Sequence, residues 1–197
     1  TRESLGLELV GETYPERFLV AAVREELTDH MEDLAWVNYV ADPDEWMVLL
    51  RTPDHWRVLL PIAPEDDREE GEFSEDDVQA RLTGVVDLGR PWDIIQWSPY
   101  IVNRRVAEKM RIGRVLLAGD AAHQNSPLGG MGMNSGIQDG ISAARRLAQV
   151  WSGTGDEALL DEYDVNRRKV ATDYVQADSH ANWLALREPD PDRRREL

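Results

Sequence analysis

The segment Val115–Gly140, VLLAGDAAHQNSPLGGMGMNSGIQDG, carries the strongest structural signal in the chain. Its first four residues, Val115–Ala118, are apolar and predict a short strand covered on both faces. Gly119 would let the chain turn sharply, so that Asp120 projects from the carboxyl end of that strand. In open α/β sheets this edge is where ligands bind. The segment therefore indicates an α/β fold with a ligand site.

The loop that follows has the chemistry of an anion site. Three of its residues lack side chains that could block a ligand from the backbone N–H groups: Gly129, Gly130 and Gly132. They lie at the start of a predicted helix, where free N–H groups and the helix dipole favour negative charge. The carboxylate of Asp120 accepts hydrogen bonds, so it suits hydroxyls rather than phosphates. We expect a ligand with hydroxyls at one end and a flat, partly anionic group at the other.

The stretch Gly130–Ser135, GMGMNS, superficially resembles a dinucleotide fingerprint. In the true fingerprint the first glycine stands directly at the strand–helix turn, and an acid follows about twenty residues later. Here 11 residues separate Ala118 from Gly130, and no acid ends a strand at the required distance. We therefore exclude a nicotinamide Rossmann site on this loop.

Charge and composition exclude several classes of partner. The chain has 22 basic and 38 acidic side chains and a net charge of −16, which would repel nucleic acids and anionic membranes. No apolar run approaches the roughly 20 residues that a transmembrane helix needs. The absence of cysteine excludes disulfides, thiolate nucleophiles and cysteine-ligated metals, and it fits a cytoplasmic location. Much of the acidic excess lies in Pro64–Asp77, which we interpret as a solvated loop, with a partner-facing acidic patch as the alternative.

The first third of the chain predicts β structure. Alternating leucines over Leu5–Leu9 predict a strand, and a second extended run, Phe18–Val23, follows the turn-like Tyr14–Glu16. A near-repeat at ten-residue spacing then gives WVNYVADPDE, WMVLLRTPDH and WRVLLPIAPE, the first two closing with Pro-Asp. These pieces predict three consecutive antiparallel strands. Each opens with a tryptophan: Trp36, Trp46 and Trp56.

Helical signals follow. Ser74 with Asp77 predicts a helix start, and that helix continues to about Val86. A strand is expected over Ile94–Val102, whereas Arg104–Arg111 has no clear preference.

Two further helices are predicted to finish the chain. The apolar residues of the first recur at spacings of three and four: Met133, Ile137, Ile141, Ala144, Ala148 and Trp151. The second keeps the same period: Leu160, Tyr163, Val170, Tyr174, Ala177, Ala181 and Leu184. Thr154 with Glu157 resembles a capping box for it. The tail 187–197 has too little apolar surface to hold itself in place, so we expect it to fray.

These residues carry a resemblance to a known family. GRVLLAGDAAH, continuing as SPLGGMGMNSGIQD, closely resembles the second FAD motif of the flavin-dependent aromatic hydroxylases, the p-hydroxybenzoate hydroxylase-like single-component monooxygenases. SLGLELVGETYPERFLV, the stretch Trp97–Ala107 and YDVNRRKVA resemble other segments of that family. Small departures are Ser126-Pro127 in place of two prolines, and Asn166 and Lys169 in place of Glu and Pro.

The larger departure is what the sequence lacks. The family's N-terminal G-x-G-x-x-G and its middle D-G motif are absent, and Thr1-Arg2 resembles the residues just downstream of the latter. The chain therefore resembles the C-terminal portion of such an enzyme, and we expect the missing motifs to lie before residue 1.

The resemblance implies FAD as the cofactor and assigns roles to particular residues. Gly119 would shape the turn, Asp120 would bind ribityl or pyrophosphate-side hydroxyls, and Pro127 would lie along the isoalloxazine edge. Backbone N–H groups would face the flavin pyrimidine ring from Gly130, Met131, Gly132, Met133 and Asn134. Reduced flavin carries negative charge around that ring, which agrees with the anion site expected from the loop itself.

Other polar residues are given less prominent roles. We identify no catalytic acid, base or nucleophile and no metal ligands. His123 is expected to be structural, and Asp139 to be a helix-surface or capping acid rather than a catalytic one. Arg104 and Arg105 could dock a nicotinamide cofactor, but ion pairing is the preferred interpretation. The three tryptophans could line an aromatic pocket, although each alone fits a strand core or sheet face better.

The sequence thus predicts an α/β fold with two regions. Residues 1–96 would form an antiparallel substrate-side sheet, and residues 97–197 the C-terminal part of an FAD-binding domain, with a strand, a glycine-rich loop and two long helices. The function expected is that of an FAD-dependent monooxygenase that uses NAD(P)H as a transient reductant and hydroxylates a small aromatic or similar ring. A homodimer or a complementing N-terminal segment is the candidate protein partner. The alternatives are a non-catalytic interaction or complementing module, and a related flavin enzyme such as a halogenase or reductase.

Overall fold

The protein has a mixed α/β fold, as expected. The computed structural model describes residues 2–43 and 45–194. Its contacts divide the chain into two compact units, each made of two chain segments. Unit 1 comprises Thr1–Tyr14 and Val102–Trp183, and unit 2 comprises Pro15–Ile101 and Leu184–Leu197. The candidate ligand segment lies in unit 1.

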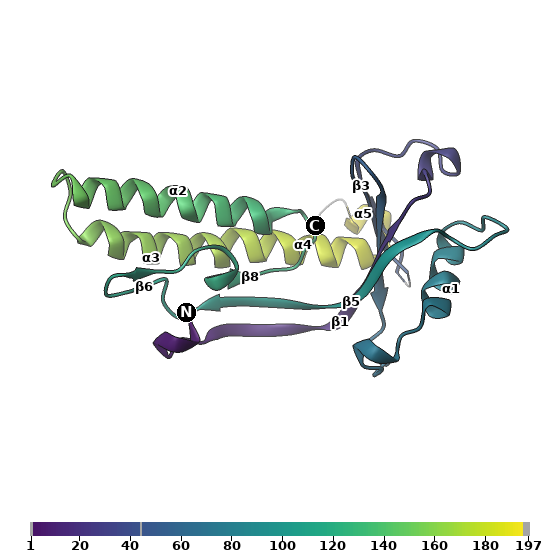
Figure 1. Cartoon of the computed structure of the whole chain (residues 1–197), viewed down its shortest axis with the longest axis horizontal. Coiled ribbons are helices and arrows are strands. Elements are labelled where there is room, and N and C mark those ends of the chain that lie inside the picture. Colours follow the sequence, from purple (N-terminus) through teal and green to yellow (C-terminus); the bar gives the residue numbers. More distant parts are fainter. Residues whose placement is uncertain (1, 44, 195–197) are drawn as a thin grey trace. The chain divides into compact units, whose positions relative to one another are not determined.

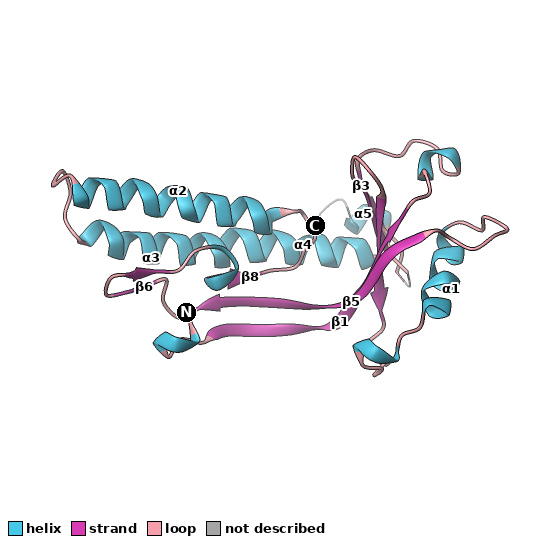
Figure 2. Ribbon diagram, viewed as in Figure 1, coloured by secondary structure: helices cyan, strands magenta, loops and turns pink. Residues whose placement is uncertain are grey.

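One sheet runs through the chain, and its strands are hydrogen-bonded in the order β2-β3-β4-β1-β5-β8 (Figures 1 and 2). The strands are β1 (Leu9–Val23), β2 (Val37–Val40), β3 (Met47–Arg51), β4 (Trp56–Ile62), β5 (Ile94–Ala107) and β8 (His123–Gln124). Two long strands, β1 and β5, contribute residues to both units.

The predicted three-stranded meander is confirmed in unit 2. β2 pairs antiparallel with β3, and β3 pairs antiparallel with β4, with Val48 opposite Leu59. Trp46 and Trp56 are buried. Trp36 is exposed, and the Arg51 guanidinium lies over its ring. The turn residue Asp44 lies outside the described residues.

Helix α1 (Glu75–Val85) closes the core of unit 2. It begins as predicted, because the Ser74 hydroxyl accepts the Asp77 backbone N–H at 3.2 Å and the Asp77 carboxylate accepts the Ser74 N–H at 2.8 Å. Its inward residues Val78 and Leu82 are fully buried. They pack in one cluster with strand residues that include Leu19, Ala21, Val23, Leu49, Val58 and Leu60.

The acidic run 64–77 is largely exposed, as predicted for a solvated loop. It nevertheless has internal order. Arg68 pairs with Asp66 at 2.7 Å and with Asp77 at 2.9 Å, and the Arg17 guanidinium donates to the Asp66 carbonyl at 2.5 Å. A short 3-10 turn, η3 (Glu70–Glu72), precedes α1. Basic side chains therefore hold this acidic segment in place within unit 2.

At the start of the chain the predicted extended run Phe18–Val23 is confirmed, but the predicted strand over Leu5–Leu9 and the turn at Tyr14–Glu16 are wrong. Glu3–Leu5 forms a 3-10 turn, η1, which Gly6 ends in a left-handed conformation at φ 69°. A single strand, β1, then runs from Leu9 through the supposed turn to Val23. Proline is tolerated at Pro15 because the pairing with β4 begins only at Arg17, so no ladder bond to that strand is lost.

The middle of the chain also differs from expectation. β5 continues to Ala107, beyond the predicted Val102. The supposed strand over Val115–Ala118 has only two paired residues, β7 (Val115–Leu116), which form a hairpin with β6 (Arg111–Ile112). Because this hairpin lies at the surface of unit 1, Ala118 is exposed rather than covered on both faces.

Unit 1 also contains two long helical segments. They are α2 (Met131–Trp151) and α3 (Ala158–Val170), which lie side by side in Figure 1. The capping box predicted at Thr154 is absent: its hydroxyl donates instead to the Gln149 carbonyl, and Glu157 stands at the N-cap position without a side-chain hydrogen bond to the helix backbone. The core of this unit gathers Leu7, Ala107, Met110, Leu117, Ala122, Tyr163 and Ala171.

The last helix contains a π-helical segment that its periodicity did not reveal. This segment, η5 (Ala171–Gln176), joins α3 to α4 (Ala177–Arg187). A π turn holds an extra residue, so the buried face moves to a new set of positions. Leu160 and Tyr163 are buried as predicted, but Tyr174 is 57% and Leu184 40% exposed. The residues buried after the shift are Val175, Gln176, Ser179 and Leu186.

The tail is more ordered than predicted up to Arg194. Residues Pro191–Arg194 form a short helix, α5, and the Arg194 guanidinium donates to the Glu188 carbonyl at 2.6 Å. Residues 195–197 lie outside the described part of the chain. Among the described residues, no helix has the length and apolar character needed to cross a membrane.

Candidate functional site

The Gly119–Asp120 turn is built by a backbone conformation that favours glycine. Gly119 has φ 60°, and it starts a 3-10 turn, η4 (Gly119–Ala121), directly after the extended Ala118. The Ala122 N–H closes this turn on the Gly119 carbonyl at 2.7 Å. Asp120 is exposed. Its carboxylate is therefore available to a ligand, although it follows a surface hairpin rather than a strand of a parallel sheet.

A contact between two glycines places this turn against α2. A Cβ atom on Gly136 would lie 3.2 Å from the Gly119 Cα, so the two backbones approach closely. The Gly119 N–H also donates to the Asp139 carboxylate of α2 at 2.9 Å. The turn that bears Asp120 is thereby fixed to the first turns of this helix.

The glycine-rich loop leads into the N-terminus of the same helix. Gly129 and Gly130 both have positive φ, 94° and 64°, which side-chain-bearing residues rarely adopt. The Gly130 N–H donates to the Pro127 carbonyl at 3.0 Å, which tightens the loop. Pro127 is exposed between the buried Ser126 and Leu128. The loop is thus anchored by its neighbours and presents its proline outward.

The N-terminus of α2 has no side-chain cap, because Gly130 occupies the N-cap position. The backbone N–H groups of the first turn are therefore directed out of the helix end without a side chain to accept them. Met133 is 74% exposed, and the Asn134 amide donates back to the Gly130 carbonyl at 3.2 Å. The structure thus gathers the predicted residues around one helix end: Gly119, Asp120, Pro127, Gly130, Met131, Gly132, Met133 and Asn134.

Asp139 has a different place from the one predicted. It was expected at the helix surface, but it is fully buried. Besides the Gly119 N–H, its carboxylate accepts from the His123 Nε2 at 2.8 Å and from the Arg167 Nε at 2.5 Å. One carboxylate therefore ties together η4, β8, α2 and α3. His123 is buried within this network, as its expected structural role requires.

The sequence contained a signal for this network. Polar residues recur along α2 at spacings of four, three and four: Ser135, Asp139, Ser142 and Arg146. This polar row lies on the side of the helix opposite the apolar one. Because apolar rows normally face the core, the sequence predicts Asp139 as a helix-surface or capping acid instead.

The surroundings of Asp139 affect two ionisations. Burial raises the pKa of Asp139. The hydrogen bonds from His123, the Gly119 N–H and Arg167 lower this pKa by more than burial raises it, so it lies below its ordinary value. Burial, together with the negative charge of Asp139, raises the pKa of Tyr163 to about 12. The Tyr163 hydroxyl accordingly stays protonated and donates to the Leu117 carbonyl at 2.6 Å.

Acidification should therefore destabilise unit 1 through Asp139. Since its folded-state pKa is below the unfolded value of about 3.9, the stabilisation is fully present above that value and is lost as the pH falls through the folded pKa. We expect the amides of residues 102–183 to lose protection from hydrogen exchange below about pH 4, after correction for intrinsic rates. Asp139→Asn should lack this component, and an unchanged acid response in that variant would contradict the assignment.

The arginines that follow Val102 are held by unit 1 itself. Arg104 forms an ion pair with Glu12 at 3.8 Å, and Arg105 donates to the Thr13 hydroxyl at 2.8 Å. This agrees with a structural role for both. It gives no support to nicotinamide docking at these positions.

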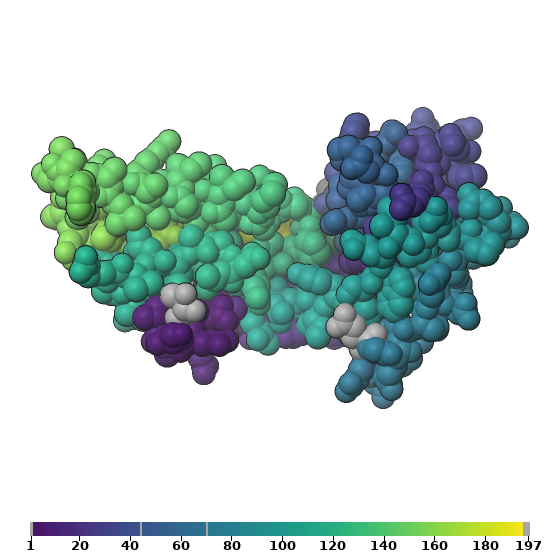
Figure 3. Space-filling view, viewed as in Figure 1, coloured from purple at the N-terminus to yellow at the C-terminus, as the bar shows by residue number. Residues whose placement is uncertain are grey.

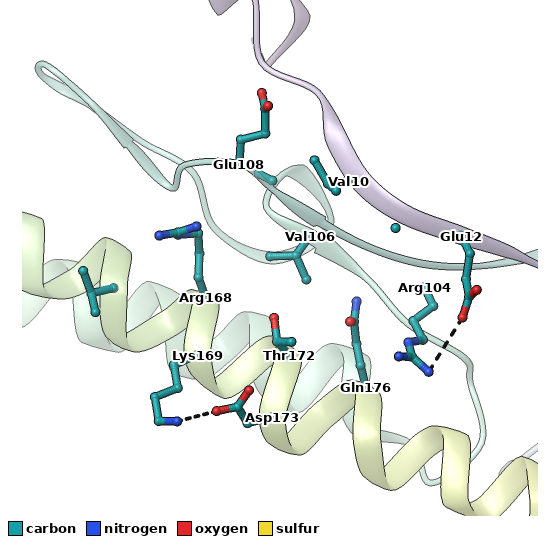
Figure 4. A pocket seen from close by; sticks show the side chains of 13 residues that line it. Val10, Glu12, Arg104, Val106, Glu108, Arg168, Lys169, Thr172, Asp173 and Gln176 are labelled. Carbon is teal, nitrogen blue, oxygen red and sulfur yellow. Dashed lines mark hydrogen bonds and ion pairs between the residues drawn. The ribbon is translucent and has the colours of Figure 1, made fainter.

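A cavity of about 910 Å³ also opens in unit 1, between β1, β5 and the helix containing η5 (Figure 4). Its charged side chains are largely neutralised by one another: Glu12 pairs with Arg104, and Lys169 with Asp173. None of the eight residues predicted to bind the cofactor lines it. The cavity is therefore separate from the residues predicted to bind the cofactor.

Comparison with known proteins identifies the family. Residues 1–178 match the model of the FAD binding domain family. The chain belongs to the FAD-dependent aromatic hydroxylase family. It is 32% identical over 200 residues to the para-nitrophenol 4-monooxygenase of Pseudomonas sp. (strain WBC-3), covering 98% of this chain and 48% of that enzyme.

Solved structures of family members share the fold. The p-nitrophenol 4-monooxygenase PnpA from Pseudomonas putida DLL-E4 matches with a TM-score of 0.85 and 32% identity, over 99% of this chain and 49% of that one. Aklavinone-11 hydroxylase, in a ternary complex with FAD and aklavinone, matches with a TM-score of 0.80 and 28% identity, over 92% of this chain and 35% of that one. The chain thus spans about half the length, or less, of the family members it matches.

Proposed function

We propose that this chain is the C-terminal portion of an FAD-dependent monooxygenase that takes electrons from NAD(P)H and hydroxylates an aromatic or similar ring. One observation carries the proposal. An exposed acid, Asp120, and a helix end at Gly130 without a side-chain cap are fixed together by the Gly119–Gly136 contact in a chain of this family. Such a pair fits a cofactor with hydroxyls at one end and an anionic ring at the other.

The two regions would divide the work. Residues 97–197 would supply the FAD side, and residues 1–96 the substrate side. Asp120 would accept hydrogen bonds from cofactor hydroxyls on the turn that Gly119 shapes, and Pro127 would lie along the edge of the flavin ring. The N–H groups of Gly130–Asn134 would face the pyrimidine ring and stabilise its negative charge. Bound FAD would supply the oxygen chemistry, and the chain would hold and orient it.

Arg167 and His123 would act at a distance from the cofactor. By fixing Asp139, they hold the Gly119 N–H and so the position of the Asp120 carboxylate. We infer that they are positioning residues. They preorganise the hydroxyl end of the site before the cofactor arrives.

The proposed substrate class rests on the names of the relatives. They include a para-nitrophenol 4-monooxygenase and an aklavinone-11 hydroxylase, which supports an aromatic or similar ring as the substrate of this protein. We further propose a cytoplasmic enzyme in which an N-terminal segment with the pyrophosphate-binding fingerprint completes the FAD site. A homodimer is the other candidate assembly.

The competing function is a non-catalytic complementing or interaction module. Oxygen uptake separates the two ideas. An enzyme half that has been completed by the N-terminal segment should consume oxygen with NAD(P)H and FAD, whereas a module should bind its partner without any such uptake.

Removing the Asp120 carboxylate should weaken FAD binding. Hydrogen bonds to a charged group contribute about 1.5–3 kcal/mol, so Asp120→Ala should raise the FAD dissociation constant about 10- to 100-fold. The measurement is flavin fluorescence quenching with the chain completed by an amino-terminal segment bearing the glycine fingerprint. Asp178→Ala, at an exposed acid on α4, is the matched control. Equal FAD affinity in both variants would overturn the role of Asp120.

A further inference from the structure

An arginine lies among aliphatic residues on one face of the sheet in unit 2. Strand side chains alternate between the two faces of a sheet. Trp56 and Val58 of β4 pack in the core that α1 closes, so Arg57 between them faces the other way. Its partners across the neighbouring strands are Ala22 on β1 and Leu50 on β3. Neither of these side chains can neutralise a guanidinium.

The Arg57 side chain has no ion pair or hydrogen bond with any residue in the described part of the chain, although the chain has a net charge of −16. Other arginines of the same unit are paired. Arg51, Arg68 and Arg81 each lie 2.7 Å from a carboxylate. A guanidinium presents its donors in a planar fork that matches a carboxylate. Arg57 therefore offers a complete fork to an anion from outside the chain.

A small pocket of about 220 Å³ opens beside Arg57, and unit 2 alone forms it. Its lining residues are Val20, Ala22, Arg57, Gln96, Trp97 and Ser98. Gln96 and Ser98 are exposed and belong to β5, and teal atoms, the colour of residues near 100, lie at the visible surface in Figure 3. The pocket thus combines two aliphatic side chains, one cation and two neutral polar side chains.

The size and chemistry of the pocket select a kind of ligand. A cavity of about 150 Å³ can hold one benzene ring. A volume of about 220 Å³ therefore leaves room for a single ring with a small substituent. Val20 and Ala22 suit the apolar surface of such a ring, and Arg57 suits an anionic substituent. The combination fits one aromatic ring that carries a carboxylate or a phenolate oxygen.

We propose that this pocket binds the charged end of the ring substrate and that Arg57 selects an aromatic anion. The inference rests on the proposed function and deepens it, because it names the substrate class and a residue that determines specificity. Four of the lining residues lie within 1–96, the region proposed to hold the substrate: Val20, Ala22, Arg57 and Gln96.

Two alternatives make different predictions. If Arg57 is only a solvated surface charge, no ring compound should bind beside it. If the pocket takes a neutral ring through Gln96 and Ser98, a charge on the ring should not change the affinity. Both alternatives become outcomes of the test.

The test compares benzoate with benzamide, which has nearly the same shape without the charge. Each is titrated into the intact chain, and into the chain joined to the amino-terminal half of the Pseudomonas sp. (strain WBC-3) para-nitrophenol 4-monooxygenase. Ligand-observed NMR gives the dissociation constants. We expect benzoate to bind about 10-fold more tightly than benzamide, the ratio that one charge-assisted hydrogen bond contributes. Acetate, an anion without a ring, should bind more weakly than benzoate.

Substitutions make the result specific to Arg57. R57Q should raise the dissociation constant of benzoate about 10-fold and leave that of benzamide unchanged. It should also leave the melting temperature nearly unchanged, because this side chain is exposed. R57K keeps the charge without the planar fork, so its affinity for benzoate should lie between those of the parent and R57Q. R193Q, at an exposed arginine of α5, is the matched control and should change none of these values.

FAD binding and oxygen uptake with NAD(P)H, measured on the joined chain, separate this inference from the proposed function. Equal affinity for benzoate and benzamide, no binding of benzoate to either form of the chain, or equal losses in R57Q and R193Q would each overturn the role of Arg57. If FAD binding and oxygen uptake are present in those cases, the proposed function still stands. Arg57-dependent benzoate binding in a joined chain without FAD binding or oxygen uptake would contradict the proposed function, and with it the assignment of the pocket to a substrate.

Discussion

Replacing Asp139 with alanine should lower the free energy of unfolding of unit 1 by about 3–5 kcal/mol, the range seen when one member of a buried ion pair is removed. The substitution leaves the partly buried Arg167 and the buried His123 without this acceptor, and the Gly119 N–H without its bond. Denaturation with urea, followed by hydrogen exchange over residues 102–183, measures the loss.

Two variants test the physical cause of that loss. Asp161→Ala removes an acid that pairs with Arg111 at 2.9 Å but whose side chain is 74% exposed, so it should cost no more than about 1 kcal/mol. Asp139→Asn keeps the shape of the side chain and one acceptor oxygen. Its loss in the free energy of unfolding should therefore lie between those of the other two variants. If Asp139→Ala were no more costly than Asp161→Ala, the buried network would not be the link that stabilises the turn.

Replacing Gly11 with alanine should lower the free energy of unfolding by about 3 kcal/mol or more, which is at the upper end of the range for overpacking. A Cβ at this position would lie 2.0 Å from the Arg104 carbonyl oxygen and 2.8 Å from the Arg105 Cα. Both obstacles are backbone of the neighbouring strand β5, so no side chain can rotate away. The backbone of Gly11, at φ 144°, is also one that alanine rarely adopts. A fall in melting temperature, measured by circular dichroism, is the readout.

The matched control is Gly84→Ala. Gly84 lies within α1, and a Cβ there meets nothing within 4 Å. Alanine is the better helix former by about 1 kcal/mol, so this variant should be as stable as the parent or more stable. A similar loss in both variants would show that the close approach of β1 and β5 is not the cause.

Local sequence patterns predicted the elements that local interactions decide. The Ser74 capping box and the tryptophan-led meander depend on neighbours within a few residues, and both are confirmed. The π segment at Ala171–Gln176 and the unbroken passage of β1 through Pro15 depend on packing partners far along the chain. A single sequence does not display those partners, so period and turn rules gave the wrong result there.

The candidate site shows the same division. The glycine loop and the Gly119–Asp120 turn were readable because glycine marks the positive φ angles that both require. Their roles toward FAD stay predictions. Asp139 was misplaced because the rule that apolar faces turn inward is inverted on α2. An acid that serves a buried network looks, in sequence, the same as one on a surface.

The interleaving of the two units bears on how such a protein can be recombined. Unit 2 consists of residues 15–101 and 184–197. The residues before 15 and those from 102 to 183 belong to unit 1. Exchanging unit 2 for that of a relative therefore needs three junctions, two of them inside the strands β1 and β5. A one-residue slip at either strand junction would turn every later side chain of that strand to the opposite face. Chimeric libraries made from this chain should accordingly place their crossovers by strand register.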